Sequence, residues 1–436
     1  MKRLTPALWT ALILTAAIHC LVAASKANAA EAMLKGNALY KDVVVYAKLG
    51  PHMTGVKGDI ATSKWIAGEL KIAGLESRLQ TWKLRQFFIH SCALTVGGHE
   101  VETFPFWYPK TTGPAPVRAP LAVMTRDTGA GELKGRIAFV SSRNSARAAV
   151  YSRGINSIAV QAAKAGAVGL VVAVGSLSGD LPAINARQPF HQTPLPLPSV
   201  IIAIKDEARA AKAAKAGLAA SLLIDGEEKP DAQAHNLVGT LRRGDRWIVV
   251  TTPTSGWFEC AGERGPGVAL FLALARWAGQ SQSQFSYLFL GNSGHELDNI
   301  GAHHTLDKYA PSVEEVACWI HLGASISTRA WEKTPSGLKP LPKVYGHLNL
   351  VGTEDLMPIL KPAFENVPGF VPRSRGRVAG ELRHFMAAGY RAFGFFGGHP
   401  FFHTRYDTPA TTEPAFLEPV GIALIDVIQK LEEKQR

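Results

Sequence analysis

The chain has 436 residues, of which 47% are hydrophobic and 19% are charged, so it can bury the cores of about two or three domains. With 41 glycines and 27 prolines, its composition is neither collagen-like nor disordered. The formal net charge of +12 is spread along the chain without a long basic run. This distribution does not indicate a nucleic-acid-binding protein.

Residues 1–30 have the pattern of a signal peptide. Lys2 and Arg3 precede a mostly apolar stretch at 9–24, and Ala-Asn-Ala at 27–29 supplies the small residues that cleavage requires. We therefore expect the mature protein to be exported, as a periplasmic or secreted protein. No later stretch approaches the length of a membrane span, so we expect none in the mature chain. The alternative is that the segment stays uncleaved as an N-terminal anchor.

After this cleavage three cysteines remain: Cys92, Cys260 and Cys318. They allow at most one disulfide, and no two cysteines have the CxxC spacing. The sequence thus predicts neither a disulfide-stapled scaffold nor a zinc ribbon or thioredoxin-like redox site.

The predicted elements change in character along the mature chain. Apolar residues at helical spacing predict a helix over 59–70, which ends before Gly74. From about 116 to 225, short strands alternate with Ala- and Lys-rich helices. The strands are predicted at 136–140, 169–174, 199–204 and 221–224, and the helices at 157–165 and 206–216.

After residue 235 the predicted strands become almost wholly apolar and alternate with long helices. This order predicts a largely parallel sheet with helices on both faces. The strands are predicted at 247–252, 285–290, 316–322 and 391–396, and the helices at 267–278 and 414–433.

Polar side chains gather in the loops that follow these strands, at 260–267, 291–296 and 399–404, and His321 closes a further strand. Ligands bind at the carboxyl ends of strands in such sheets. Two carboxylates and an imidazole from these loops could hold Zn²⁺ and leave a fourth position for water. The His295-Glu296 pair is not an HExxH motif, because Asn299 stands where the second histidine belongs.

Six stretches of the mature chain share their pattern with one enzyme family: GPHMTGVKGDIATSKWIAGELKIAGL, NLVGTLRRGDRWIVVTT, GERGPGVALFLALARW, FSYLFLGNSGHELDNIGA, GELRHFMAAGYRAFGFF and FFHTRYDTPATT. On these stretches the sequence resembles the zinc aminopeptidase-like metallopeptidases, which include secreted aminopeptidases, plasma glutamate carboxypeptidase and glutaminyl cyclases. The resemblance implies an α/β core with a largely parallel, helix-flanked sheet, formed by residues 31–110 and 236–436. Residues 111–235 resemble an inserted protease-associated domain, on LKGRIAFVSS, AVQAAKAGAVGLVVA and PLPSVIIAIKDEARAAKAAKAG.

The resemblance also implies roles for single residues. Glu263 corresponds to the carboxylate that bridges two zinc ions, and Glu296 and His403 correspond to further ligands of one of them. The other zinc site has changed, because no histidine lies in 251–255 and His321 replaces an aspartate.

One zinc ion, held by the three preserved positions as in glutaminyl cyclases, is therefore expected, with His321 as a secondary ligand. His295 replaces the glutamate base and would move the proton, and Phe402 replaces a tyrosine that donates to an oxyanion. Arg264, Phe402 and Arg375 are predicted to contact the substrate.

These expectations lead to three functional hypotheses. The first is an exported zinc-dependent hydrolase that acts on peptide or amide bonds through one metal ion. The second is a non-catalytic relic of the fold that binds peptides or glycans, with Arg264 neutralising the former ligand carboxylates. The third is a hydrolase or transferase directed to a non-peptide substrate.

Overall fold

The computed structural model describes residues 32–141, 153–335 and 337–434. The predicted signal peptide lies outside these residues. Across the described ranges, no helix has the length and apolar character that crossing a membrane requires. Cys92, Cys260 and Cys318 are all free thiols.

Four parallel strands form the centre of the main sheet, as predicted, and they end at one edge. The antiparallel β8 and β14 flank them, and the order is β15-β14-β16-β11-β9-β10-β8. The parallel strands are β9 (Trp247–Pro253), β10 (Ser286–Asn292), β11 (Val316–His321) and β16 (Ala392–Gly397). The flanking strands are β8 (Ala219–Leu241), β14 (Leu348–Gly352) and β15 (Pro372–Arg373).

Helices cover both faces of this sheet, which confirms the predicted α/β class. Ile248 and Val250 belong to the core beneath one group of helices, whereas Val249 and Trp319 belong to the core on the opposite face. The first group consists of α2 (Gly36–Lys48), α3 (Lys57–Ile72), α7 (Ala261–Gln280), α9 (Met357–Ala363) and α11 (Pro414–Glu433). The second consists of α8 (Ile300–Tyr309) and α10 (Leu382–Ala387).

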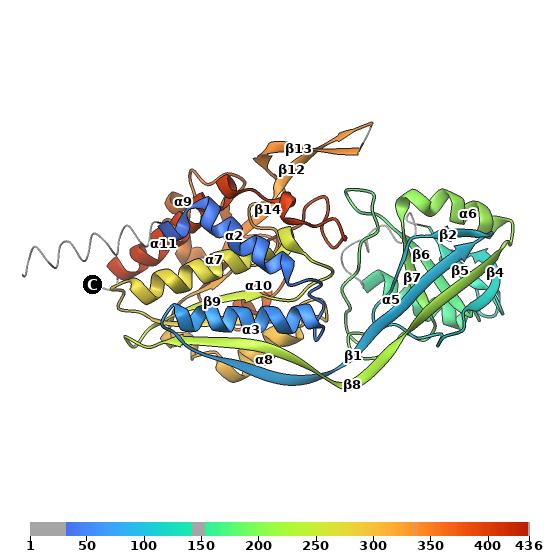
Figure 1. The fold of residues 1–436 in the computed structure, drawn as a ribbon, viewed down its shortest axis with the longest axis horizontal. Coiled ribbons are helices and arrows are strands. Elements are labelled where there is room, and N and C mark those ends of the chain that lie inside the picture. Colours follow the sequence, from blue (N-terminus) through green and yellow to red (C-terminus); the bar gives the residue numbers. More distant parts are fainter. Residues whose placement is uncertain (1–31, 142–152, 336, 435–436) are drawn as a thin grey trace, which may run out of the picture.

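The N-terminal segment is part of this core. Helices α2 and α3 both contact α7, beside which Figure 1 shows them. Leu39, Val43 and Ile66 are fully buried in the same cluster as α7. Residues 36–72 therefore build the same layer as α7, from the other end of the chain.

A smaller lobe lies beside the core, and two long strands connect it to the core (Figure 1). These strands, β1 (Glu76–Val96) and β8, pair antiparallel over most of their length. Irregular pairing between Leu84 and Gln86 and between Ile89 and Ser91 interrupts the ladder, as bulges do where strands bend. Strand β8 continues across the border predicted at 235. Strand β1 enters the smaller lobe before the border predicted at 110. The two lobes therefore share continuous strands.

Within the smaller lobe, short strands alternate with helices over about 116–225, as predicted, and neighbouring strands of this part pair in parallel. That this lobe is a protease-associated domain stays a prediction. Its strands are β2 (His99–Val101), β3 (Thr103–Pro105), β4 (Val117–Val123), β5 (Ile137–Val140), β6 (Gly169–Val174) and β7 (Ser199–Ala203). Its helices are α5 (Arg153–Lys164) and α6 (Glu207–Lys215). A separate hairpin of β12 (Arg329–Thr334) and β13 (Gly337–Val344) projects from the core in Figure 1.

Candidate active site

The predicted site residues come from the loops at the carboxyl ends of the parallel strands. Glu263 and Arg264 lie in the first turn of α7, after β9. His295 and Glu296 lie in the loop after β10, and His321 is the last residue of β11. Phe402 and His403 follow β16. The sheet topology therefore places all of these residues at one edge, as the sequence predicts.

Asp407 fixes the start of α7. Its two carboxylate oxygens accept hydrogen bonds from the backbone N–H groups of Gly262, at 2.8 Å, and Glu263, at 2.9 Å. These are N–H groups that a helix start leaves without partners, and a negative charge there is favourable. Asp407 thereby positions the backbone from which Glu263 and Arg264 extend.

Glu263 is paired with its own neighbour. Arg264 Nη2 lies 2.6 Å from Glu263 Oε1, and the two side chains are 1% and 0% exposed. Arg264 Nε donates to the Ser255 carbonyl oxygen at 2.9 Å, which holds the guanidinium inward. Burial alone would raise the pKa of Glu263, but Arg264 and His403 outweigh it and lower the pKa to about 2. Glu263 is thus an ionised carboxylate with a built-in cation beside it.

His403 lies on the other side of this carboxylate. Its Nε2 is 3.4 Å from Glu263 Oε1, and its Nδ1 is 3.1 Å from the carbonyl oxygen of Ala183 in the smaller lobe. The Phe402 ring stacks on the imidazole with the ring centroids 4.1 Å apart. Both ring nitrogens of His403 therefore have protein partners.

Glu296 is held by hydroxyl and backbone donors. Its Oε1 accepts hydrogen bonds from Thr54 N at 2.5 Å and Thr54 Oγ1 at 2.6 Å, and its Oε2 accepts one from Ser255 Oγ at 2.8 Å. Thr54 precedes α3, so the N-terminal segment supplies two of the three donors. The bonds to Glu296 anchor the loop after β10 to the core.

The arrangement does not fit a zinc ion. Within the described ranges, no group of three His, Cys, Asp or Glu side chains lies close enough to hold a metal. Arg264 offsets the charge of Glu263, although the two buried oxygens of Glu263 accept no hydrogen bond from the described residues. The oxygens of Glu296 accept hydrogen bonds from three donors. A guanidinium beside Glu263 would also repel a divalent cation.

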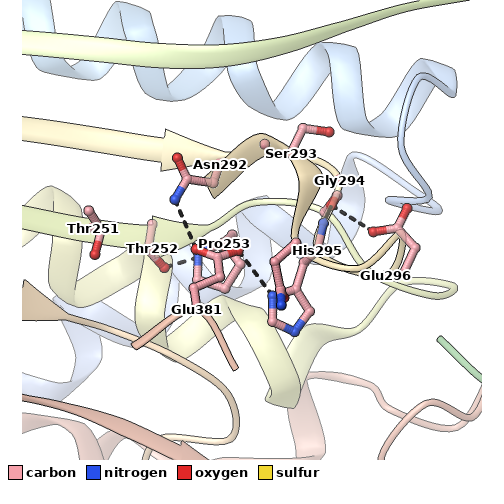
Figure 2. Close-up of polar contacts among 12 residues, drawn as sticks. Thr251, Thr252, Pro253, Asn292, Ser293, Gly294, His295, Glu296 and Glu381 are labelled. Carbon is pink, nitrogen blue, oxygen red and sulfur yellow. Dashed lines mark hydrogen bonds and ion pairs between the residues drawn. The ribbon is translucent and has the colours of Figure 1, made fainter. Parts of the chain in front are cut away.

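His295 has a carboxylate partner that the sequence analysis missed. Its Nδ1 lies 3.0 Å from Glu381 Oε1, and Asn292 Nδ2 donates to Glu381 Oε2 at 2.8 Å (Figure 2). Burial, followed by the charge of Arg264, lowers the pKa of His295 well below its usual value. Burial raises the pKa of Glu381 to about 7. Near neutral pH, His295 is thus an uncharged imidazole whose orientation Glu381 sets.

His321 forms part of the wall of the site. Its Nδ1 lies 3.0 Å from Thr251 Oγ1, which also accepts a hydrogen bond from Trp319 Nε1 at 3.0 Å. Burial and then Arg264 lower the pKa of His321 to about 3. Thr251 lies in the segment where the resemblance implies a histidine ligand. In place of such a ligand, this segment offers His321 a hydroxyl partner.

A cavity of about 410 Å³ opens beside these groups, and His295, His321 and Phe402 line it. Arg375, predicted to contact the substrate, does not line the cavity, but its near neighbours Arg373 and Arg377 do. The remaining lining residues come from several elements: Asn185, Arg187, Asn299, Gly323, Ala324, His347, Asn349, Ala379, Gly380, Phe395, Phe396, Gly397 and Gly398.

Sequence reasoning missed Thr54, Arg187 and Glu381. Glu381 and Thr54 lie in two of the stretches that carry the family resemblance, GELRHFMAAGYRAFGFF and GPHMTGVKGDIATSKWIAGELKIAGL. Their position in these stretches is the sequence signal that could have identified them. Arg187 lies in the smaller lobe, and nothing in the sequence indicated that it reaches the site.

The four-strand centre, the helices on both faces and the site at the strand ends define an aminopeptidase-like fold. BSAP, a zinc aminopeptidase from Bacillus subtilis, is similar in structure with a TM-score of 0.70 at 17% sequence identity, over 91% of this chain and 95% of that chain. The structure of a peptidase M28 precursor from Shewanella amazonensis gives a TM-score of 0.71 at 15% identity, over 95% and 97%. The aminopeptidase from Aneurinibacillus sp. strain AM-1 gives 0.65 at 17% identity, over 92% and 94%.

The sequence itself matches no protein-family model and no curated protein. At 15–17% identity the structural likeness shows a shared fold. Function must be argued from the site.

Proposed function

We propose that this protein binds a small peptide or amide ligand in the cavity and does not hydrolyse it through a metal ion. The observation that carries the proposal is the buried contact between Glu263 and Arg264, 2.6 Å long. The carboxylate that would bridge metal ions is already compensated by a guanidinium. Because Arg264 already compensates the buried charge of Glu263, a metal ion that bound beside the guanidinium would add little stabilisation.

The hydrogen bonds of Glu296 support the same proposal. For Glu296 to ligate zinc, its carboxylate would have to give up donors from Thr54 and Ser255. Hydrogen bonds to a charged group contribute about 1.5–3 kcal/mol each. The zinc-dependent hydrolase expected from the family resemblance therefore gives way to the binding hypothesis.

The cavity has the character of a binding site. It combines apolar surface from Phe395, Phe396 and Phe402 with polar groups such as Asn185 and Asn299. Apolar walls with a few directed polar groups are typical of sites that hold small molecules. Peptides are the ligand class that the fold favours.

Calorimetric titration of the purified protein with short peptides, with and without EDTA, tests this proposal. We expect saturable binding that EDTA leaves unchanged, and peptides that remain intact by mass spectrometry. Ala324→Phe places a large ring at the cavity wall and should abolish binding, whereas Ala387→Phe, on the exposed surface of α10, should not.

Hydrolysis that EDTA abolishes would overturn the proposal in favour of the zinc-dependent enzyme. Saturable binding of an oligosaccharide with no peptide bound would overturn the assignment to peptides and give the cavity to glycans.

We further propose that the protein is exported, because residues 1–30 combine a basic start, an apolar stretch and small residues at 27–29. N-terminal sequencing of protein recovered from the cell envelope or medium should find a chain that begins near Ala30. Met1 retained on a cytoplasmic protein would contradict export.

A further inference from the structure

Three arginines, from two lobes of the molecule, line the cavity. Arg373 lies in β15 and Arg377 on the loop that follows, while Arg187 comes from the smaller lobe. No Asp or Glu side chain is among the lining residues in the described part of the chain. The cavity wall is therefore cationic.

The histidines do not supply this charge. His295 and His321 line the cavity, but burial and the nearby guanidinium of Arg264 lower the pKa of both. They are neutral imidazoles at neutral pH. The positive charge of the wall comes from guanidinium groups, which stay protonated throughout the physiological pH range.

The arginines differ in how their charge is balanced. Arg187 forms an ion pair of 2.5 Å with Asp298, which offsets much of its charge. Arg373 Nη2 donates to the side-chain oxygen of Asn349, an uncharged group that also lines the cavity. Asn349 orients the Arg373 guanidinium without neutralising it.

We infer that the ligand of this cavity carries a carboxylate, which Arg373 binds together with Arg377. This inference rests on the proposed function and deepens it. The planar fork of a guanidinium matches a carboxylate with two parallel N–H···O bonds, and an Arg–carboxylate contact is among the stronger polar contacts that proteins make. In a peptide, the carboxylate is either the C-terminus or an acidic side chain.

The chain offers a matched control for this inference. Arg375 lies between the two arginines in the sequence and is exposed like them, but it does not line the cavity. Arg373→Gln, Arg377→Gln and Arg375→Gln each remove one positive charge from the exposed segment 373–377. All three variants should fold, since none of these side chains is buried.

The experiment is calorimetric titration with three peptides of equal length: trialanine, trialanine amide and Ala-Glu-Ala amide. We expect Arg373→Gln and Arg377→Gln to weaken binding of the carboxylate-bearing peptides about tenfold, equivalent to about 1.4 kcal/mol. Arg375→Gln should change it by less than about twofold. Tighter binding of trialanine assigns the C-terminus as the recognised group, and tighter binding of Ala-Glu-Ala amide assigns the side chain.

Equal losses in all three variants would overturn the inference, because they would indicate a general electrostatic field. Equal binding of trialanine and the two amides would overturn it too, but would leave the proposed function standing. If no peptide binds, or if bound peptide is cut in an EDTA-sensitive way, the proposed function falls as well.

Discussion

Replacing Arg264 with methionine tests the built-in cation directly. The variant keeps an unbranched apolar side chain but removes the guanidinium, and it leaves the buried Glu263 carboxylate without its cationic partner. The wild-type pKa of Glu263 is lowered from 4.5 to about 2, which is worth about 3 kcal/mol of stability at pH 7. Breaking a buried ion pair from one side typically costs about 3–5 kcal/mol. We therefore expect Arg264→Met to lose about 3–5 kcal/mol of unfolding free energy at pH 7.

The sign of the pH dependence provides a second readout. Without the guanidinium, burial raises the pKa of Glu263 with only the neighbouring histidines left to oppose it, so we expect the pKa of Glu263 in the variant to be higher than in the wild type. The penalty is then present above that pKa and disappears as the pH falls and the carboxyl becomes protonated. Urea unfolding followed by tryptophan fluorescence should show a smaller difference between variant and wild type at pH 4.5 than at pH 7.

Arg276 is the matched control. It pairs with Asp42 at 2.5 Å and Glu69 at 2.7 Å, but its side chain is 25% exposed. Arg276→Met should cost about 1 kcal/mol. Glu263→Gln combined with Arg264→Met should recover part of the lost stability, because the uncompensated charge is gone. If Arg264→Met costs no more than Arg276→Met, or costs the same at pH 4.5 as at pH 7, the reasoning about Glu263 is wrong.

Three further outcomes follow from the site. Thr54→Val removes the hydroxyl that donates to Glu296 at 2.6 Å and should cost about 1.5–3 kcal/mol in urea unfolding; a loss below about 0.5 kcal/mol would contradict this bond's role. The pKa of Glu381 is about 7 in the folded protein, above its ordinary value of 4.5. The free energy of unfolding therefore falls by about 3 kcal/mol as the pH rises from 4.5 to 7. Glu381→Gln should therefore gain stability over wild type across that interval, and parallel pH profiles would refute the assignment. Phe402→Tyr restores the hydroxyl that the family resemblance implies, yet it should release no peptide fragments detectable by mass spectrometry, since Arg264 remains; fragments would count against the proposal.

The elements of the core could be predicted because their signals are local. The strands at 247–252 and 285–290 are short apolar runs between turn residues, and both appear within a residue or two in β9 and β10. The helix predicted at 414–433 has these bounds in the structure. Helix α7 starts six residues before the predicted 267, because Asp407, distant in sequence, caps an earlier turn.

The continuous course of β8 could not be predicted from local signals. Residues 225–235 are mostly polar and partly exposed, and no strand is predicted there from the sequence. Pairing with β1 along its length keeps this segment extended. Pairing with a strand distant in sequence thus keeps residues 225–235 in a β-strand that their own composition does not favour.

In the site, too, backbone positions could be predicted from the sequence, whereas side-chain partners could not. The sequence brings Glu263, Glu296 and His403 to one edge of the sheet, because the topology fixes their backbone positions. It does not distinguish a carboxylate that ligates a metal from one that accepts hydrogen bonds. That distinction depends on Thr54, which donates to Glu296, and on the Ser255 carbonyl, which turns Arg264 inward.

We propose that the Arg264 guanidinium compensates the Glu263 carboxylate in place of a metal ion. The most direct measurement is the zinc content of the purified protein, determined by elemental analysis after equilibration with excess zinc and desalting, for wild type and Glu296→Ala. We expect far less than one zinc per chain in both proteins. A stoichiometry close to one zinc per chain in the wild type, lost in Glu296→Ala, would contradict it and restore the single-metal hydrolase.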